Sequence, residues 1–205
     1  MKKTIDVYEH MGEILKGVKS GVLITGKADD KVNSMTISWG MLGIEWGKPI
    51  FVTFIRENRF TRSLIEKTGE FTVSIPVDDS AKKILSFCGS KSGRDVDKAK
   101  ELGFTYEEPE MTSAPGVKEL PLTLECKVVY KQAQDMNAMT EENKAKFYPQ
   151  DVDSLFTGSN KDTHVAYYGE IVTAYVIEEL ICISVKTAPR HWGAEFFALC
   201  IEAVP

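Results

Sequence analysis

The chain has no long apolar run. Its most apolar stretches, such as IFVTFI at residues 50–55, are far too short to span a bilayer. The first ten residues, MKKTIDVYEH, carry two lysines but no apolar segment behind them, so we do not expect a signal peptide. These absences predict a cytoplasmic protein that does not contact membranes.

Cysteine and histidine are scarce and scattered. The four cysteines and three histidines form no CxxC pair and no cluster with metal-ligand spacing, so we predict no metal site. The cysteines are Cys88, Cys126, Cys182 and Cys200. In a reducing compartment we expect them to be free thiols, most of them buried as small hydrophobic groups.

Positive charge is in deficit. The chain has 25 basic and 30 acidic residues and a formal net charge of −5. A protein that binds nucleic acids takes much of its affinity from neutralising phosphates with basic side chains. The charge balance therefore argues against a nucleic-acid partner, although it still allows a local basic pocket.

The common catalytic and nucleotide-binding motifs are also missing. There is no HExxH, GxSxG or GxGxxG, and no Ser-His-Asp spacing. Residues 21–28 fit a phosphate-loop pattern superficially, but Ala28 stands where Ser or Thr must contact magnesium. The interior of that stretch, VLIT, favours a strand. If the protein is an enzyme, its reactive atom belongs to a bound cofactor.

What the chain does contain is a series of strand patterns, in a length that suits one domain with a substantial core. We predict strands at residues 21–25, 33–40, 50–55, 71–76, 122–132, 164–177 and 181–185. We predict a helix capped by Asn58 or Thr61 that runs to about Lys67, and a helix through residues 81–87 capped by Asp78 or Asp79. Further helices are predicted at 95–102 and 140–147, with a loop at 89–93. Short helices between many strands favour a mainly β fold, a closed or nearly closed antiparallel barrel. An α/β sheet is the alternative, but few connections hold a helix long enough for a parallel crossover.

The stretch NSMTISWG, residues 33–40, alternates small hydroxyls with large apolar side chains. The hydroxyl row is Ser34, Thr36 and Ser38, and the apolar row is Met35, Ile37 and Trp39. The apolar row predicts core packing. The hydroxyl row predicts either an ordinary exposed sheet face or the floor of a ligand site.

A turn rich in arginine follows the strand at residues 50–55. Arg56 and Arg59 supply charge, and Thr61 and Ser63 supply hydroxyl donors, next to a predicted helix start. The unpaired amides and the positive dipole end of a helix start suit a phosphate. The alternative is a solvated polar turn.

Two further stretches are weaker candidates. Residues 87–95, FCGSKSGRD, have two glycines, two serines and a lysine, and this predicts either a ligand-binding loop or a plain connector. Cys88 has no base beside it in the sequence, which gives little support for a nucleophile. His164 begins a long strand pattern, where a lone histidine is more often a surface residue than a catalyst, and His191 is interpreted in the same way.

Taken together, these segments resemble the flavin-reductase-like FMN-binding proteins, and the flavoredoxin branch in particular. The resemblance rests on NSMTISWG, PIFVTFIRENRFTRSLIEKTGEFTVSIP, CGSKSGRDVDKAKELGF and THVAYYGEI in this order. It covers roughly residues 10–185 and implies a split β-barrel, usually a homodimer, that holds FMN near the subunit interface. We treat residues 1–205 as one domain, with an insert around 136–161 and an aromatic tail at 187–205 as additions.

The resemblance also implies a set of FMN contacts. Beside the isoalloxazine ring it implies Ser34, Met35, Thr36 and Trp39. Around the ribityl phosphate it implies Arg56, Asn58, Arg59, Phe60 and Thr61. Closing over another part of the cofactor it implies Cys88, Gly89, Ser90, Lys91 and Ser92. His164 is implied as the catalytic residue near the ring, where a nicotinamide would stack.

Three functions are compatible with this site. The first is an NAD(P)H-dependent reductase of flavins or other small acceptors, which works by hydride transfer at flavin N5. The second is a flavoredoxin-like electron carrier, reduced by a partner protein. The third is a non-enzymatic FMN-binding or haem-related module on the same barrel. Nothing in the sequence distinguishes NADH from NADPH.

Overall fold

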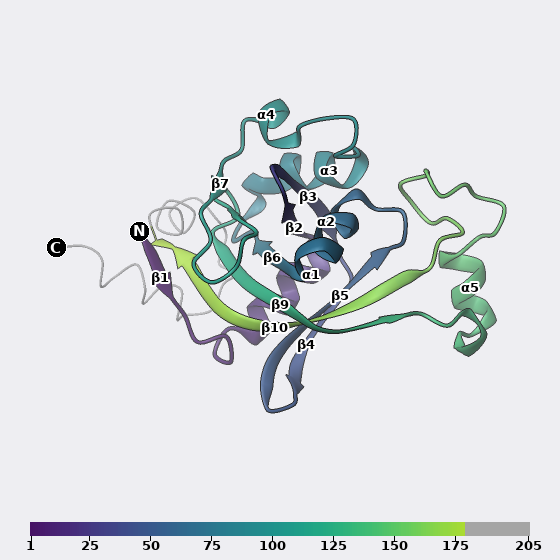
Figure 1. Ribbon diagram of the computed structural model, residues 1–205, viewed down its shortest axis with the longest axis horizontal. Coiled ribbons are helices and arrows are strands. Elements are labelled where there is room, and N and C mark those ends of the chain that lie inside the picture. The colour runs from purple at the N-terminus through teal and green to yellow at the C-terminus, as the bar shows by residue number, and fades with distance from the viewer. Residues whose placement is uncertain (179–205) are drawn as a thin grey trace.

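One large antiparallel β-sheet forms the centre of the computed structural model, which describes residues 1–178 of the chain (Figure 1). The strands of this sheet are β1 (Lys2–Thr4), β2 (Val22–Ala28), β3 (Lys31–Ile37), β4 (Gly40–Glu45), β5 (Lys48–Arg56), β6 (Glu70–Ile75), β9 (Leu122–Ala133) and β10 (His164–Ile177). Their order across the sheet is β3-β2-β6-β9-β10-β5-β4, and β1 pairs with the end of β10. Every pairing among these strands is antiparallel.

Short helices and a small second sheet fill the connections. The helices are α1 (Met11–Ser20), α2 (Phe60–Thr68), α3 (Lys82–Ser90), α4 (Lys98–Leu102) and α5 (Glu141–Phe147), with 3₁₀ turns η1 (Asp79–Ala81) and η2 (Met136–Ala138). The small sheet pairs β7 (Tyr106–Glu107) with β8 (Gly116–Val117). Helices α2 and α3 pack on β2 and β3, and α1 packs against β4 and β6.

The large sheet does not close on itself, because its edge strands β3 and β4 are not paired with each other. Only Ser38 and Trp39 separate these two strands along the chain. We call this opening, bounded by β3, β4, Ser38 and Trp39, the seam. The arrangement confirms the predicted mainly β fold, a split barrel. The alternative of an α/β sheet is wrong, because the described strands contain no parallel pair.

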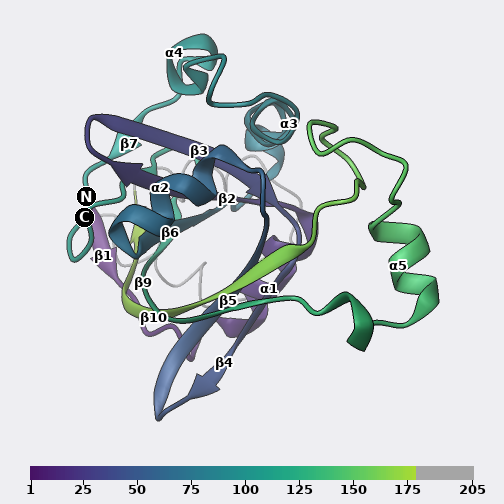
Figure 2. The ribbon, with the colours of Figure 1, turned by 45° about the vertical axis from the view of Figure 1, so that its right-hand side comes forward.

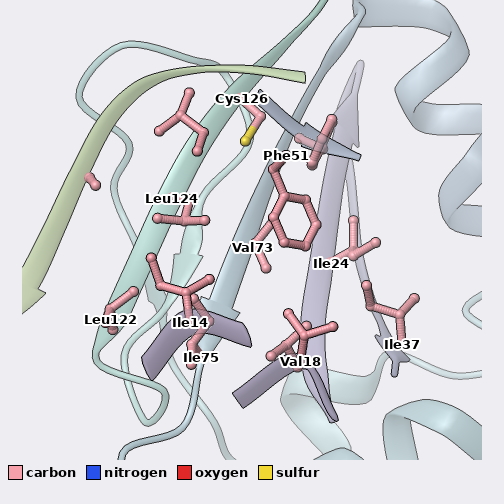
Figure 3. Close-up of a cluster of buried hydrophobic side chains, with 14 of the residues drawn as sticks. Ile14, Val18, Ile24, Ile37, Phe51, Val73, Ile75, Leu122, Leu124 and Cys126 are labelled. Carbon is pink, nitrogen blue, oxygen red and sulfur yellow. The ribbon is translucent and has the colours of Figure 1, made fainter. Parts of the chain in front are cut away.

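The main hydrophobic core lies inside the curve of the sheet. Figure 3 shows its side chains pointing toward one another from α1, β2, β3, β5, β6 and β9. The labelled members are Ile14, Val18, Ile24, Ile37, Phe51, Val73, Ile75, Leu122, Leu124 and Cys126. Ile14 and Val18 share one face of α1 because residues four apart on a helix lie one above the other. The inward residues of β9 are two apart, as the period of a strand requires.

Several predicted elements are confirmed. The strand at 164–177 has the predicted bounds, and β9 extends the strand predicted at 122–132 by one residue. Gly69 ends α2 in a left-handed conformation with φ of 69°. Thr140 caps α5, since its hydroxyl accepts a hydrogen bond from the Asn143 amide. The phosphate-loop-like stretch at 21–28 forms strand β2, as its VLIT interior indicates.

Other predictions are wrong in their bounds. The strand predicted at 33–40 ends at Ile37, since the chain leaves the sheet edge there to cross the seam. Gly89 and Ser90 belong to α3 and not to a loop. The helix predicted from residue 95 begins at Lys98, because the side chain of Asp97 caps it by accepting from the Lys100 amide.

Several elements were not predicted at all; the longest of them are α1 and β4. Gly12 and Gly17 lower the helix propensity of residues 11–20. Gly17 is required by packing, because a Cβ there would lie 2.5 Å from Cγ2 of Ile75. Strand β4 turns into β5 at Trp46 and Gly47, both with positive φ, and a non-glycine residue in that conformation is unusual.

Some expectations concern residues outside 1–178. These are the strand at 181–185, the aromatic tail at 187–205, Cys182, Cys200 and His191, all of which lie outside the described residues. Within the described part, Cys88 and Cys126 are buried free thiols, as expected. No helix between residues 1 and 178 is both long and apolar enough to cross a bilayer.

The close packing at Gly169 on β10 gives a prediction about stability. A Cβ at this position would lie 2.5 Å from Cζ of Phe71 and 2.8 Å from Cβ of Cys126, whereas a Cβ at Gly43 on β4 would meet nothing within 4 Å. We expect Gly169→Ala to lower the free energy of unfolding by about 1–3 kcal/mol, as overpacked cores do. Gly43→Ala is the control and should change it by no more than about 0.5 kcal/mol. Urea unfolding of both variants checks this, and equal stabilities would contradict the packing described here.

Candidate active site

A cleft of about 390 Å³ lies at the seam of the barrel. Four segments meet there: the end of β3 with the seam residues, the turn from β5 into α2, the chain from α3 to α4, and the connection from α5 to β10. Figure 2 shows α5 standing to one side of the sheet, beyond the start of β10. The lining residues are Asn33, Met35, Thr36, Ile37, Ser38, Trp39, Phe54, Arg56, Asn58, Arg59, Phe60, Thr61, Cys88, Gly89, Lys91, Ser92, Gly93, Arg94, Lys98, Phe147, Ser154, Leu155, Thr157, Gly158, Ser159 and His164.

The cleft concentrates positive charge. Its cationic lining residues are Arg56, Arg59, Lys91, Arg94 and Lys98, and no Asp or Glu is among the lining residues that the structure describes. The charge of Asp162 acts to raise the pKa values of Arg56 and Arg59, but burial outweighs it and both pKa values are lowered. In a chain with a net charge of −5, this separation of charge favours the binding of an anion.

Arg56 is buried and its donors face the connection from α5 to β10. Nη1 donates to the backbone carbonyl of Asp162 at 2.5 Å and to that of Asn160 at 3.3 Å. Nη2 donates to the carbonyl of Phe147 at 2.9 Å. Burial lowers the pKa of Arg56 from its usual value, and these carbonyls supply the hydrogen bonds that a buried guanidinium requires. The structure therefore uses Arg56 to hold the insert.

Arg59 and Arg94 lie nearer the opening. Arg59 donates from Nη2 to the carbonyl of Thr157 at 2.9 Å, and Arg94 donates from Nη1 to the carbonyl of Asn58 at 3.0 Å. The guanidinium of Arg94 also lies over the ring of Phe60, 5.6 Å from its centroid. Burial lowers the pKa of Arg59, and the charge of Arg94 lowers it further. The repulsion between these two positive charges is reduced when an anion binds between them.

Lys98 forms part of the cleft floor and is itself buried. Its ammonium donates to the carbonyl of Ser34 at 2.8 Å and to the carbonyl of Cys88 at 2.9 Å. Desolvation lowers the pKa of Lys98 to about 8, so the side chain is still mainly charged at pH 7. An ammonium has three protons to donate, and the two carbonyls take two of them.

The hydroxyl row of β3 contributes to the cleft unequally. The Ser34 hydroxyl is fully buried, 2.7 Å from the Thr25 hydroxyl, and it does not line the cleft. Thr36 lines the cleft while donating to the carbonyl of Leu85 at 2.5 Å. Ser38, at the seam, lines the cleft and is exposed.

The apolar row of the same stretch is only partly core. Ile37 is buried as predicted, and Met35 packs against the core from the cleft side. The prediction that Trp39 belongs to the core is wrong, because the strand ends before it and its side chain remains 37% exposed. Its ring lies in the cleft, 5.0 Å from the ring of Phe147 and 4.9 Å from that of His164 between centroids.

His164 is held as a neutral imidazole. Burial, together with the charges of Arg56 and Arg59, lowers its pKa to about 3. Nδ1 lies 2.8 Å from the Tyr148 hydroxyl, and that hydroxyl donates to Oε1 of Gln134 at 2.7 Å. Because the hydroxyl has one proton, it accepts from Nδ1 of His164. The proton is therefore on Nδ1, and Nε2 is left as an acceptor.

The end of α3 and the residues that follow it cover one side of the cleft. Gly89, Lys91 and Ser92 line it, whereas Ser90 does not. Cys88 lines it from below, and burial raises the pKa of this thiol, so it stays protonated at neutral pH. Among residues 1–178, Lys98 is the one charged group that acts on the thiol, which gives no support for a nucleophile.

The structure brings together most of the residues predicted for the site, and it adds several that sequence reasoning missed. These are Asn33, Phe54, Gly93, Arg94, Lys98, Phe147 and, from the insert, Ser154, Leu155, Thr157, Gly158 and Ser159. Gly93 and Lys98 stand in the GSKSGRDVDK stretch, so the motif offered a signal for both. A Cβ at Gly93 would lie 2.0 Å from Oδ1 of Asn33, so this approach requires glycine. No sequence pattern placed the insert at the cleft, because its position depends on hydrogen bonds from Arg56, which is distant in the sequence.

Comparison with known proteins gives one consistent family. The model of the "Flavin reductase like domain" family matches residues 15–182. An uncharacterised protein of Archaeoglobus fulgidus is 30% identical over 120 residues, which are 58% of this chain and 66% of that protein, just under two thirds of its length. The solved structure of a flavoredoxin from Methanosarcina acetivorans has a TM-score of 0.56 and 25% identity, over 77% of this chain and 68% of that one. A putative flavin reductase with a split barrel domain from Shewanella frigidimarina has a TM-score of 0.58 and 23% identity, over 84% and 75% of the two chains.

The low pKa of His164 gives a prediction about acid stability. Unfolded histidine titrates near 6.5, so between pH 6.5 and about 3 the unfolded chain holds the extra proton, and the free energy of unfolding falls as the pH falls. We expect His164→Asn to remove this component, which amounts to about 2 kcal/mol between pH 6.5 and 5. Urea unfolding of both proteins at pH 7 and pH 5 checks this. Identical losses of stability on acidification would show that His164 titrates normally in the folded state.

Proposed function

Since this chain belongs to the flavin reductase like domain family, whose FMN-binding members share its fold, we propose that it is an FMN-dependent oxidoreductase. We propose more specifically an NAD(P)H-dependent reductase of flavins or other small acceptors. The single observation that carries this proposal is the cleft at the seam, with five cationic side chains and no acidic one in its described lining. Bound FMN would supply the reactive centre, taking a hydride at N5 from a nicotinamide.

The charged end of the cleft suits the ribityl phosphate. Arg59, Lys91 and Arg94 would provide charge-assisted donors, and Thr61 would provide a hydroxyl at the start of α2. The Thr61 hydroxyl already accepts from the side-chain amide of Asn33 at 2.7 Å, which leaves its own proton for a ligand. Asn58 and Phe60 complete this end as lining residues.

The uncharged end suits the flat ring. Met35, Thr36 and Trp39 would lie beside the isoalloxazine, with Gly89 and Ser92 along its edge. Ser34 would act from below, where its carbonyl fixes the ammonium of Lys98. We propose that the protein orients the ring and excludes water from it.

His164 has a narrower role in this proposal than that of an acid or base. Its neutral ring presents Nε2 as an acceptor, with the tautomer fixed by Tyr148. An acceptor at this place would hold an N–H group of the cofactor or of the nicotinamide carboxamide. Hydride transfer itself does not require a proton from the protein, so a residue without acid–base function is sufficient.

A flavoredoxin-like electron carrier is the second candidate. The flavoredoxin of Methanosarcina acetivorans, with 25% identity, is the observation in its favour. Such a carrier would exchange electrons with a partner protein and react slowly with nicotinamides. A non-enzymatic FMN-binding module is the third candidate and predicts binding without turnover.

We also propose a homodimer in the cytoplasm. Large apolar side chains of the β4–β5 hairpin stand exposed on the outer face of the sheet, Met41 and Trp46 among them. Tyr130 on β9 continues this face, and its ring lies 6.4 Å from that of Trp46. A second copy of the chain would cover this apolar surface. The surface begins beside Trp39, so the cleft would lie near the subunit interface.

The choice between reductase and carrier can be tested with the purified, FMN-loaded protein. We expect a yellow protein whose flavin absorbance near 450 nm bleaches within seconds when NADH or NADPH is added without air, consistent with turnover rates of about 1–1000 per second. Stopped-flow absorbance with each nicotinamide is the measurement. A flavin that binds but stays oxidised would favour the electron carrier, and a protein that takes up no FMN would contradict the whole assignment.

The phosphate contacts can be tested by mutation. Arg59→Ala combined with Thr61→Ala should weaken FMN binding by about 1.5–3 kcal/mol for each charge-assisted hydrogen bond lost. Arg62→Ala is the matched control, because Arg62 bonds to Tyr167 and the Glu57 carbonyl and does not line the cleft. Fluorescence titration with FMN checks this. An FMN affinity that is the same in the double variant and the control would refute the phosphate assignment.

A further inference from the structure

A short series of hydrogen bonds leads from the cleft to the end of strand β9. His164 lines the cleft, and its Nδ1 lies 2.8 Å from the hydroxyl of Tyr148. That hydroxyl donates to Oε1 of Gln134 at 2.7 Å. Tyr148 and Gln134 both lie outside the lining of the cleft. Two residues that a ligand in the cleft would not touch are therefore bonded, one after the other, to a residue that it would touch.

Backbone bonds and ring packing hold the three side chains in this order. Gln134 comes directly after β9, and its backbone amide donates to the carbonyl of His164 at 2.9 Å. Tyr148 comes directly after α5, and its amide donates to the carbonyl of Lys144 at 2.9 Å. The buried ring of Tyr148 meets the His164 ring edge-on, with centroids 5.6 Å apart, and the guanidinium carbon of Arg56 lies 5.1 Å from its centroid. The alignment therefore does not depend on the side-chain hydrogen bonds alone.

The direction of the series is set at the Gln134 end. An amide oxygen can only accept, so the single proton of the Tyr148 hydroxyl is used there. The hydroxyl offers His164 only a lone pair, and the proton of the neutral imidazole stays on Nδ1. Burial raises the pKa of Tyr148, so the hydroxyl keeps its proton at neutral pH. The positive charges of Arg56 and Arg59 oppose a second proton on the His164 ring.

We propose that Gln134 is a positioning residue that acts through Tyr148 to keep the proton of His164 on Nδ1, so that His164 offers the cleft a hydrogen-bond acceptor. What this acceptor binds rests on the proposed function. It suits an N–H donor, which FMN carries on its imide and NAD(P)H on its carboxamide. A carbonyl oxygen at the same place would meet a lone pair and lose its hydrogen bond. Gln134 thus selects the ligand group without contact with it.

Nuclear magnetic resonance of the ligand-free protein, with isotope-labelled histidine nitrogens, tests the tautomer. The signals of His164 are the ones that His164→Asn removes. At pH 7 we expect the Nδ1–H form to exceed the Nε2–H form by at least about 10-fold, the equivalent of one hydrogen bond. Gln134→Leu should make Nε2–H the major form, because the released proton of Tyr148 turns toward Nδ1. Gln134→Glu should keep the native form, because a carboxylate also accepts from the hydroxyl.

Two further variants control this measurement. Gln150→Leu is the matched control, because Gln150 donates to the backbone carbonyl of Tyr148 at 2.8 Å and not to its hydroxyl. It should keep the native tautomer. Tyr148→Phe removes the hydroxyl itself and should also move the proton to Nε2, because a buried Nδ1–H would lose its acceptor. This variant decides the role of the series if Gln134→Leu does not fold.

Two affinity measurements identify which N–H group His164 binds. They are a fluorescence titration with FMN and stopped-flow reduction of the FMN-loaded protein by NADH. If the flavin imide is the donor, Gln134→Leu should weaken FMN binding by roughly 10-fold. If the carboxamide is the donor, FMN binding should stay the same and the dissociation constant of NADH should rise by about as much. Gln150→Leu should change neither affinity.

The outcomes separate this inference from the proposed function. A proton on Nε2 in the native protein, or the same tautomer in the native protein and Gln134→Leu, overturns the positioning role. A changed tautomer with both affinities unchanged overturns the role of His164 as the acceptor for the ligand. A protein that takes up no FMN overturns the proposed function and the ligand with it, whereas the tautomer measured without ligand still decides the role of Gln134.

Discussion

Cationic side chains that converge on one cleft repel one another, and a bound anion removes that cost. Here the charge of Arg94 lowers the pKa of Arg59, and the charge of Arg59 lowers the pKa of Lys98, each in addition to burial, in a chain that is acidic as a whole. No carboxylate in the described lining neutralises them. The site is therefore built for a ligand with an anionic group at one end. The aromatic and hydroxyl residues at the other end extend the same site toward a flat ring.

The open seam of the barrel is where the cleft forms. Because β3 and β4 remain unpaired, Ser38 and Trp39 cross the opening and line the cleft. In a closed sheet their side chains would either pack inside the barrel or point to solvent. Trp39 thereby reaches His164 and Phe147. The insert then covers the side of the opening that the sheet leaves free. It is held mainly by Arg56, whose buried guanidinium donates to backbone carbonyls of the insert and of Asp162 just after it. These hydrogen bonds do not depend on which side chains the insert carries.

The sequence predicted most of this arrangement where local patterns decide it. Elements that depend on neighbouring residues were predicted with few errors. They are the alternating strands at 122–132 and 164–177, the end of α2 at its glycine and the start of α5 at Thr140. The resemblance placed the cleft residues of β3, of the arginine turn and of the loop after α3. Helix α1 was not predicted, because Gly17 has a low helix propensity. The structure keeps a glycine there because packing against the neighbouring strand leaves no room for a side chain. The place of residues 147–162 and the actual partners of Arg56 depend on contacts between residues 91 to 106 apart, which no local pattern encodes.

The comparison of FMN with riboflavin tests the central claim most directly, because the two ligands differ only in the phosphate. Isothermal titration of the ligand-free protein at low salt is the measurement. If the cationic end of the cleft holds the phosphate, FMN should bind about 100-fold or more tightly than riboflavin, which corresponds to two charge-assisted hydrogen bonds. The preference should shrink as salt is added. Equal affinities for the two ligands would contradict the account.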